Sequence, residues 1–130
     1  IAIFLAFSTG SSWGTFAILI PIVTAIFSGG GNMEMMVISI SAVLAGAVCG
    51  DHVSPISDTT IMSSAGAQCH HIDHVSTQMQ YAIVVAVVCV FGYLIAGFVQ
   101  VWWIVLLISV AVLLTTLTIM RKYVNKKYSK

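Results

Sequence analysis

Charge is scarce in this sequence. Of its 130 residues, only 7% are Asp, Glu, Lys or Arg, whereas 59% are hydrophobic. Soluble domains carry about 25% charged residues, so this composition excludes a water-soluble globular domain. Apolar segments separated by short polar ones instead predict an all-α membrane protein. The length allows one compact unit at most.

Basic residues are absent before position 121. The five that the chain contains are Arg121, Lys122, Lys126, Lys127 and Lys130. Cytoplasmic segments of membrane proteins are enriched in Lys and Arg, so residues 121–130 are predicted to be a basic cytoplasmic tail. Such a tail beside a hydrophobic helix is typical of a topology signal, and no nucleic acid is expected as a partner. The predicted location is the cell membrane, which the chain crosses several times.

Cysteine is infrequent in the sequence, and an initiator methionine is absent. The three cysteines, Cys49, Cys69 and Cys89, form no C-x-x-C motif and lie near small or apolar residues. They indicate free thiols and exclude a disulfide framework or a zinc motif. The sequence starts at Ile1, inside an apolar run. We therefore expect the C-terminal piece of a longer protein, whose N-terminal half supplies part of any site.

Proline occurs twice, and Pro55 lies in the most polar stretch of the chain. Residues 50–60 contain two carboxylates, one imidazole and four hydroxyl side chains, and they follow an uncharged segment. Backbone groups freed there cannot face lipid, and proline disfavours helix at the residue before it. We predict a discontinuous helix over residues 33–67 with a break at 50–58. Ionisable residues at membrane depth mark this break as an ion site.

The break offers oxygen atoms, the ligands that a hard cation such as Na⁺ prefers. Burial raises the pKa of a carboxyl group, which then holds a proton until a bound cation favours its ionised form. One carboxylate can thus bind Na⁺ or H⁺ in turn. The predicted cation ligands are Asp58, Asp51, Ser57, Thr59 and Ser54, and Thr60 is assigned to the substrate site.

Two carboxylates are candidates for the exchanging group. We favour Asp58, because hydroxyl side chains flank it closely. Asp51, with His52 beside it, is then a second ion ligand or the proton acceptor. The alternative is that one of the two only caps a half-helix, and Asp58 is the predicted N-cap of the second half.

Residues 1–27 are uncharged but interrupted by small hydroxyl residues at 8–12. The first apolar flank is too short to cross the hydrocarbon core, which needs about 20 residues. Two interpretations stay open. One is a re-entrant hairpin with its tip at 8–12, and the other is the end of one helix followed by a second helix. Ser and Thr at such a turn can cap the second helix and leave oxygen atoms for a ligand.

Three segments follow the broken helix. Residues 68–78 are polar and are predicted to be a cytoplasmic loop, whereas 79–99 and 102–120 are uncharged and long enough to span the membrane. The loop contains a group of ionisable side chains: His70, His71, Asp73 and His74. Their spacing is typical of metal ligands on a helix and of pH-sensing imidazoles. Solvated side chains at the membrane boundary are the simpler interpretation.

Long stretches of this sequence resemble the NhaC family of Na⁺/H⁺ antiporters. The resemblance lies in residues 50–60 (GDHVSPISDTT), 63–67 (SSAGA) and 71–78 (HIDHVSTQ), and upstream in 8–16 (STGSSWGTF). It covers residues 1–97, whereas the segment from Trp102 carries no such signature.

The resemblance implies an inner-membrane secondary transporter that exchanges Na⁺ for H⁺ and needs no cofactor beyond these transported ions. It also implies half of an inverted-repeat transporter, in which a hairpin and a broken helix meet, and a homodimer. Six residues are then expected to approach the substrate: Ser11, Ser12, Thr15, Ser57, Asp58 and Thr59. The absence of Lys and Arg at membrane depth favours cation exchange over organic-acid exchange.

There are two alternatives to the exchange of Na⁺ for H⁺. The same family implies, as an alternative, the exchange of an organic acid such as malate for lactate, coupled to Na⁺ and H⁺. Helix N-termini can bind an anion without basic side chains. An intramembrane hydrolase is disfavoured, because the sequence contains neither H-E-x-x-H nor G-x-S-x-G. The protein is therefore not expected to be an enzyme.

Overall fold

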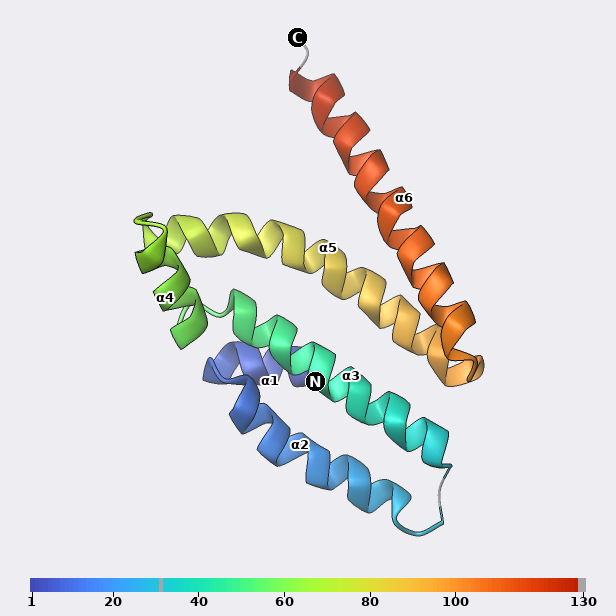
Figure 1. The fold of residues 1–130 in the computed structure, drawn as a ribbon. Helices are drawn as coiled ribbons and strands as arrows, with labels where there is room; N and C mark the ends of the chain where they lie inside the picture. The colour runs from blue at the N-terminus through green and yellow to red at the C-terminus, as the bar shows by residue number, and fades with distance from the viewer. Residues whose placement is uncertain (31, 129–130) are drawn as a thin grey trace. The chain divides into compact units, whose positions relative to one another are not determined.

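The computed structural model describes residues 1–30 and 32–128, with side chains through Lys122, and this part of the chain is helical without strands (Figure 1). The helices are α1 (Ala2–Thr9), α2 (Ser12–Phe27), α3 (Met33–Val53), α4 (Asp58–Gly66), α5 (His71–Phe98) and α6 (Trp102–Tyr128). Residues 1–86 form one compact unit and the residues from 87 onward form another.

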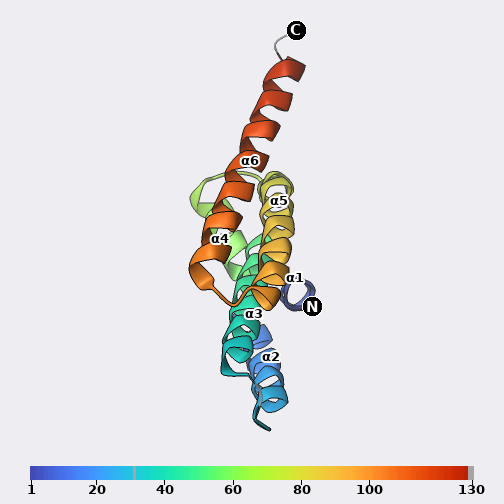
Figure 2. The same ribbon diagram turned by 90° about the vertical axis from the view of Figure 1, so that its right-hand side faces the viewer.

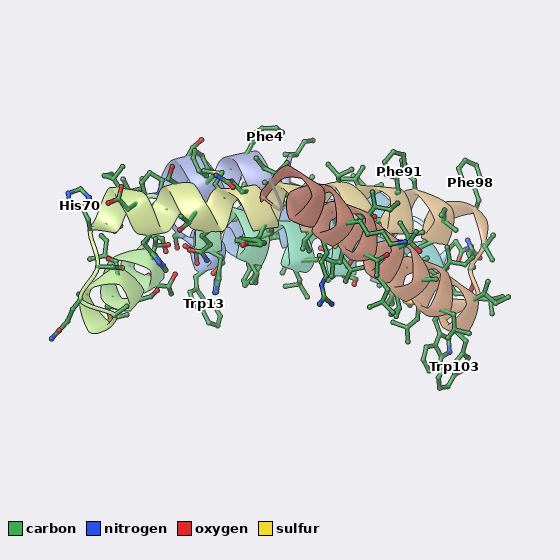
Figure 3. The ribbon with its side chains drawn as sticks, turned by 90° about the horizontal axis from the view of Figure 1, so that it is seen from above. Phe4, Trp13, His70, Phe91, Phe98 and Trp103 are labelled. Carbon is green, nitrogen blue, oxygen red and sulfur yellow. The ribbon has the colours of Figure 1, made fainter. Side chains whose placement is uncertain are left out.

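Three helices are long and apolar enough to cross a membrane. They are Met33–Val53, His71–Phe98 and the Trp102–Lys122 part of α6. Large apolar side chains also lie outward in the first unit, where Phe4 and Trp13 point away from the helices on opposite sides (Figure 3). A surface of this kind suits lipid or another part of a membrane protein. The prediction of an all-α membrane protein is confirmed.

The small hydroxyl residues near the start of the chain form a turn between two helices. Gly10 ends α1 with a φ of 65°, which a residue without a Cβ adopts readily. Ser11 then caps α2, because its Oγ accepts a hydrogen bond of 3.2 Å from the backbone N–H of Gly14. Residues 1–27 are therefore a pair of helices joined by a tight turn.

The first two helices lie against α3, and Figure 2 shows α1 nearly end-on beside it. Small side chains build the contact between α1 and α3. Ala2, Ala6 and Ala47 are buried in one cluster, and a Cβ on Gly46 would lie 3.1 Å from that of Ala2. Helices in membranes associate closely where small residues let their backbones approach.

The break after α3 is shorter than predicted. The sequence placed it at residues 50–58, but α3 continues to Val53 and α4 begins at Asp58. The reason is that Pro55 disfavours the helical conformation at Ser54, the residue before it, so that α3 ends at Val53 and Asp51 stays helical. With 21 residues, α3 extends for about 32 Å.

The predicted cytoplasmic loop at 68–78 is largely helical. The helix α5 begins at His71 and includes the polar residues through Gln78. Polar side chains indicate polar surroundings, and they do not prevent the backbone from forming a helix. Asp73 even favours this helix start, since a carboxylate stabilises the first turn.

The two predicted transmembrane segments lie within α5 and α6. In the second unit, these helices approach closely where Gly92 lies, because a Cβ there would sit 2.8 Å from the Oγ of Ser109. The predicted basic tail at 121–130 does not begin as a separate element, since α6 continues to Tyr128. The side chains of Lys126 and Lys127, and Lys130 as a whole, lie outside the described residues.

Gly50→Ala should destabilise the first unit by about 1–3 kcal/mol. An added Cβ would collide with the backbone carbonyl oxygen of Ile3 and would lie 3.0 Å from the Cβ of Ala6. The measurement is the melting temperature of the full-length protein in detergent. Gly66→Ala is the control, because nothing lies within 4 Å of a Cβ at that helical glycine. Equal melting temperatures for both variants would contradict the close packing of α1 on α3.

Candidate ion site

A buried carboxylate lies where α3 ends. Asp51 is 7% exposed, and its Oδ1 accepts a hydrogen bond of 2.6 Å from the hydroxyl of Ser57, which is fully buried. This distance is typical of a hydroxyl bound to a charged oxygen. The sequence separates the two residues by six positions, and the break at 54–57 brings them together.

A second hydroxyl extends this contact. The Oγ1 of Thr59 lies 2.8 Å from the Oγ of Ser57. Because the single hydrogen of Ser57 goes to Asp51, Thr59 is the donor of that second bond. Two hydroxyl groups in series, those of Thr59 and Ser57, therefore connect the exposed side chain of Thr59 to the buried carboxylate of Asp51.

The break is also fixed to the turn between α1 and α2. The hydroxyl of Ser54, which is fully buried, donates a bond of 2.7 Å to the carbonyl oxygen of Phe7. A Cβ on Gly10 would lie 2.8 Å from Ile56, so the backbone of the turn is in direct contact with the break. Two irregular backbone segments, far apart in the sequence, thus meet at one place.

A further bond joins the two halves of the broken helix. Thr60, which is buried, donates through Oγ1 to the carbonyl oxygen of His52 at 3.0 Å. That carbonyl lies in the last turn of α3, where helical partners are missing. The side chain of His52 is itself exposed in the described chain.

Among the described residues, the side-chain contact of the Asp51 carboxylate is to the hydroxyl group of Ser57. In the sequence, no Lys or Arg occurs before Arg121. An arrangement of this kind can bind an incoming cation or a proton.

Asp58 occupies a different position from Asp51. It begins α4, its side chain is exposed, and its Oδ1 accepts a bond of 2.8 Å from the N–H of Thr59. The N-cap of α4 is Ser57 rather than Asp58, and Ser57 makes no side-chain capping bond because its hydroxyl binds Asp51. The predicted capping role of Asp58 was therefore wrong by one residue.

The hairpin residues predicted to bind substrate lie at the start of α2. Ser12 and Thr15 are buried, and the Oγ1 of Thr15 donates to the carbonyl oxygen of Ser11 at 3.0 Å. The hydrogen bonds of Ser11 and Thr15 thus remain within the hairpin. Contact between the hairpin and the break goes through Phe7 and Gly10 instead.

The family model of the Na⁺/H⁺ antiporter family matches residues 1–98, three quarters of the chain. The chain belongs to this family. The match includes the helix pair, the break and the whole of α5, and it confirms the resemblance to NhaC antiporters.

Two curated relatives are similar to this antiporter-family chain. An uncharacterised protein of Haemophilus influenzae is 56% identical over 94 residues, which are 72% of this chain and 18% of that protein. The malate-2H⁺/Na⁺-lactate antiporter of Bacillus subtilis is 32% identical over 91 residues, 70% of this chain and 19% of that protein. The chain spans about a fifth of the length of the curated relatives it matches. No solved structure matches it significantly.

Two contributors to the site were missed in the sequence, the carbonyl of Phe7 and the ring of His71. The carbonyl of Phe7 carries no sequence signal, because any residue supplies one. The G-x-x-x-G pattern of Gly46 and Gly50, a known signal for close helix contact, was available to indicate the approach of another helix. His71 was noted only as part of a polar group, whereas its ring binds the carbonyl oxygen of Pro55 at 2.7 Å.

The histidines do not converge. His71 binds the break, His74 lies 3.0 Å from the hydroxyl of Ser63, and exposed His70 lies 3.9 Å from Asp73. Across the described part of the chain, no group of three or more His, Cys, Asp or Glu side chains is placed to hold a metal ion. Nothing in this arrangement supports the transition-metal interpretation.

Ser57→Ala should destabilise the protein, and Asp51→Asn should change the size of this effect. Removing the hydroxyl leaves a buried carboxylate oxygen without its donor, so the two side chains should show a coupling energy of about 1 kcal/mol or more. The measurement is a double-mutant cycle on melting in detergent, with the single variants and their combination. Ser63→Ala combined with Asp51→Asn is the control pair, because Ser63 binds His74 instead. Additive effects of Ser57→Ala and Asp51→Asn would contradict the bond.

Proposed function

We propose that this chain forms part of a secondary transporter that exchanges Na⁺ for H⁺ across the cell membrane. The observation that carries the proposal is the buried bond between Asp51 and Ser57 at the break that follows α3, a helix long and apolar enough to cross a membrane. Membership of the Na⁺/H⁺ antiporter family supports a transporter rather than an enzyme.

Competition for one carboxylate provides the exchange. With a proton bound, Asp51 is neutral, and Na⁺ gains little by approaching it. When the proton leaves, the carboxylate attracts Na⁺, and the bound cation in turn opposes reprotonation. The same group therefore carries one ion or the other, and transport in one direction drives transport in the opposite direction.

The geometry favours Asp51 as the exchanging group. Its side chain is buried, whereas that of Asp58 is exposed in the described chain. Asp58 lies one residue beyond Ser57 and fits the role of a second carboxylate at the entrance to the break. The oxygen ligands proposed for Na⁺ are Asp51, Ser54, Ser57, Asp58 and Thr59, with Thr60, Ser11, Ser12 and Thr15 near the path of the substrate.

The proposal also covers the rest of the transporter, the orientation of the chain in the membrane and its assembly. The remainder of the transporter, including an N-terminal repeat, would supply further ligands, because the chain spans about a fifth of its relatives. The basic residues from Arg121 onward support a cytoplasmic C-terminus by the positive-inside rule. A homodimer in the inner membrane is the expected assembly.

Exchange of an organic acid is the second candidate. It is favoured by one observation, namely that the similar protein of Bacillus subtilis is a malate-2H⁺/Na⁺-lactate antiporter. Ser57 makes no side-chain capping bond at the start of α4, and such helix ends attract anions. The chain itself offers no Lys or Arg before Arg121 to pair with a substrate carboxylate.

Na⁺ alone should dissipate a pH gradient across everted membrane vesicles that contain the full-length protein. Asp51→Asn should lower the initial rate by about tenfold or more, since it removes the group for which Na⁺ and H⁺ compete. Rates are measured with a fluorescent pH probe and scaled to the amount of protein in the membrane. Asp73→Asn is the matched control, because Asp73 is 82% exposed and lies outside the break.

The other outcomes are equally informative. If proton movement starts only after malate or lactate is added, the organic-acid function replaces the cation exchange. If Asp58→Asn abolishes exchange while Asp51→Asn does not, the exchanging group is Asp58, as the sequence favoured. Full activity in both variants would place the exchanging carboxylate outside the break.

A further inference from the structure

The start of α5 is connected to the break by one side chain. The Nε2 of His71 lies 2.7 Å from the carbonyl oxygen of Pro55. A carbonyl oxygen only accepts hydrogen bonds, so Nε2 carries the hydrogen and donates it. The two residues are 16 positions apart, and no regular helical bond could join them.

The Pro55 carbonyl needs such a partner. In a continuous helix its oxygen would accept from an N–H four residues later, but the break interrupts this pattern. Unpaired carbonyl groups away from water are costly. The neighbouring bonds within the break are long, at 3.3 Å from the N–H of Ser57 to the Ser54 carbonyl and 3.4 Å from the N–H of Ile56 to the Ser54 hydroxyl. At 2.7 Å, the bond from His71 is shorter than both of these bonds.

The second ring nitrogen anchors the imidazole. The Nδ1 of His71 lies 3.1 Å from the Oγ of Ser64, which is 3% exposed and lies 2.9 Å from the carbonyl oxygen of Ile61, so that the one hydrogen of this hydroxyl has two acceptors within reach. The ring is therefore held between α4 and the break. This double contact fixes its orientation, as the partner on one nitrogen sets the direction of the other.

We propose that His71 is a positioning residue of the ion site. By binding the carbonyl of Pro55, it holds residues 54–57 in the conformation in which the Ser57 hydroxyl reaches Asp51. The other two histidines of the group do not share this role. His74 binds Ser63 on α4, and His70 points away from the helices at the start of α5 (Figure 3).

Because His71 binds the break and the break carries Ser57 to Asp51, loss of His71 is expected to affect transport. Without the ε-nitrogen donor, the break moves more freely, and the hydroxyl of Ser57 spends less time at the carboxylate. Ion binding then weakens, while the exchanging group itself is unchanged. This consequence rests on the function proposed above, whereas the effect on the break does not.

Two substitutions distinguish the roles of the two ring nitrogens of His71. His71→Gln keeps a donor at the place of Nε2, and His71→Asn keeps polar atoms only near the place of Nδ1. His71→Ala removes both. His74→Ala and His70→Ala serve as controls, since each removes an imidazole that does not bind the break.

The first measurement is hydrogen–deuterium exchange of the full-length protein in detergent. Amide exchange at Ile56 and Ser57 should become about tenfold faster in His71→Asn and His71→Ala. His71→Gln and both controls should keep the wild-type rates. Wild-type exchange at these amides in His71→Asn would overturn the inference, and so would a His71→Gln variant as fast as His71→Ala.

The second measurement is the Na⁺ concentration that half-saturates exchange in everted vesicles. It should rise about three- to tenfold in His71→Asn, with the maximal rate per protein kept, and His71→Gln should restore it. A lower amount of protein with an unchanged half-saturating concentration indicates a merely structural role and overturns the inference. If the wild type exchanges no Na⁺, the proposed function fails, and deuterium exchange still decides the role of His71.

Discussion

The structure depends on one constraint, which is that the backbone groups freed by an interrupted helix need partners within the protein. Two bonds meet this need at the break, since Thr60 binds the carbonyl of His52 and His71 binds that of Pro55. Two further bonds fix the segment in place, from Ser54 to the carbonyl of Phe7 in α1 and from Ser57 to the Asp51 carboxylate. Because water is absent from the bilayer core, contacts of this kind are what a non-helical segment in a membrane protein requires. The same contacts expose oxygen atoms and a carboxylate to one another, which is the chemistry that a Na⁺ or H⁺ site requires.

The close approach of α1 and α3 is what makes these partners available. The bond from Ser54 to Phe7 spans 47 positions in the sequence and forms only if the two helices nearly touch. Ala2 and Ala6 on one helix, and Gly46, Ala47 and Gly50 on the other, leave room for that approach. Asp51 directly follows the last of these glycines. The burial of its carboxylate is therefore a consequence of small side chains elsewhere in the same interface.

Much of this arrangement could be predicted from local sequence features, and the remainder could not for physical reasons. Pro55 and the surrounding polar residues indicated a broken helix, and Gly10 with Ser11 indicated a turn. The ranking of Asp58 above Asp51 came from their neighbours in the sequence, whereas burial depends on α1, which is distant along the chain. Polarity predicts a loop over residues 68–78, but residues 71–78 are helical, because polarity reports the surroundings and not the backbone conformation. The role of His71 required knowledge of where Pro55 lies, and no spacing rule supplies it.

The contact between Gly50 and the backbone of Ile3 also bears on motion. Transporters of this general kind work by alternating access, in which one group of helices rocks against another. Long side chains at an interface can change rotamer and let helices slide, but a glycine facing a carbonyl oxygen has no atom that can give way. The helices α1 and α3 are therefore packed as one close pair, with the break and the turn fixed to their ends. If the chain exchanges ions as proposed, the surfaces that slide are expected on the outside of this pair, where bulky residues such as Phe4 and Trp13 are exposed.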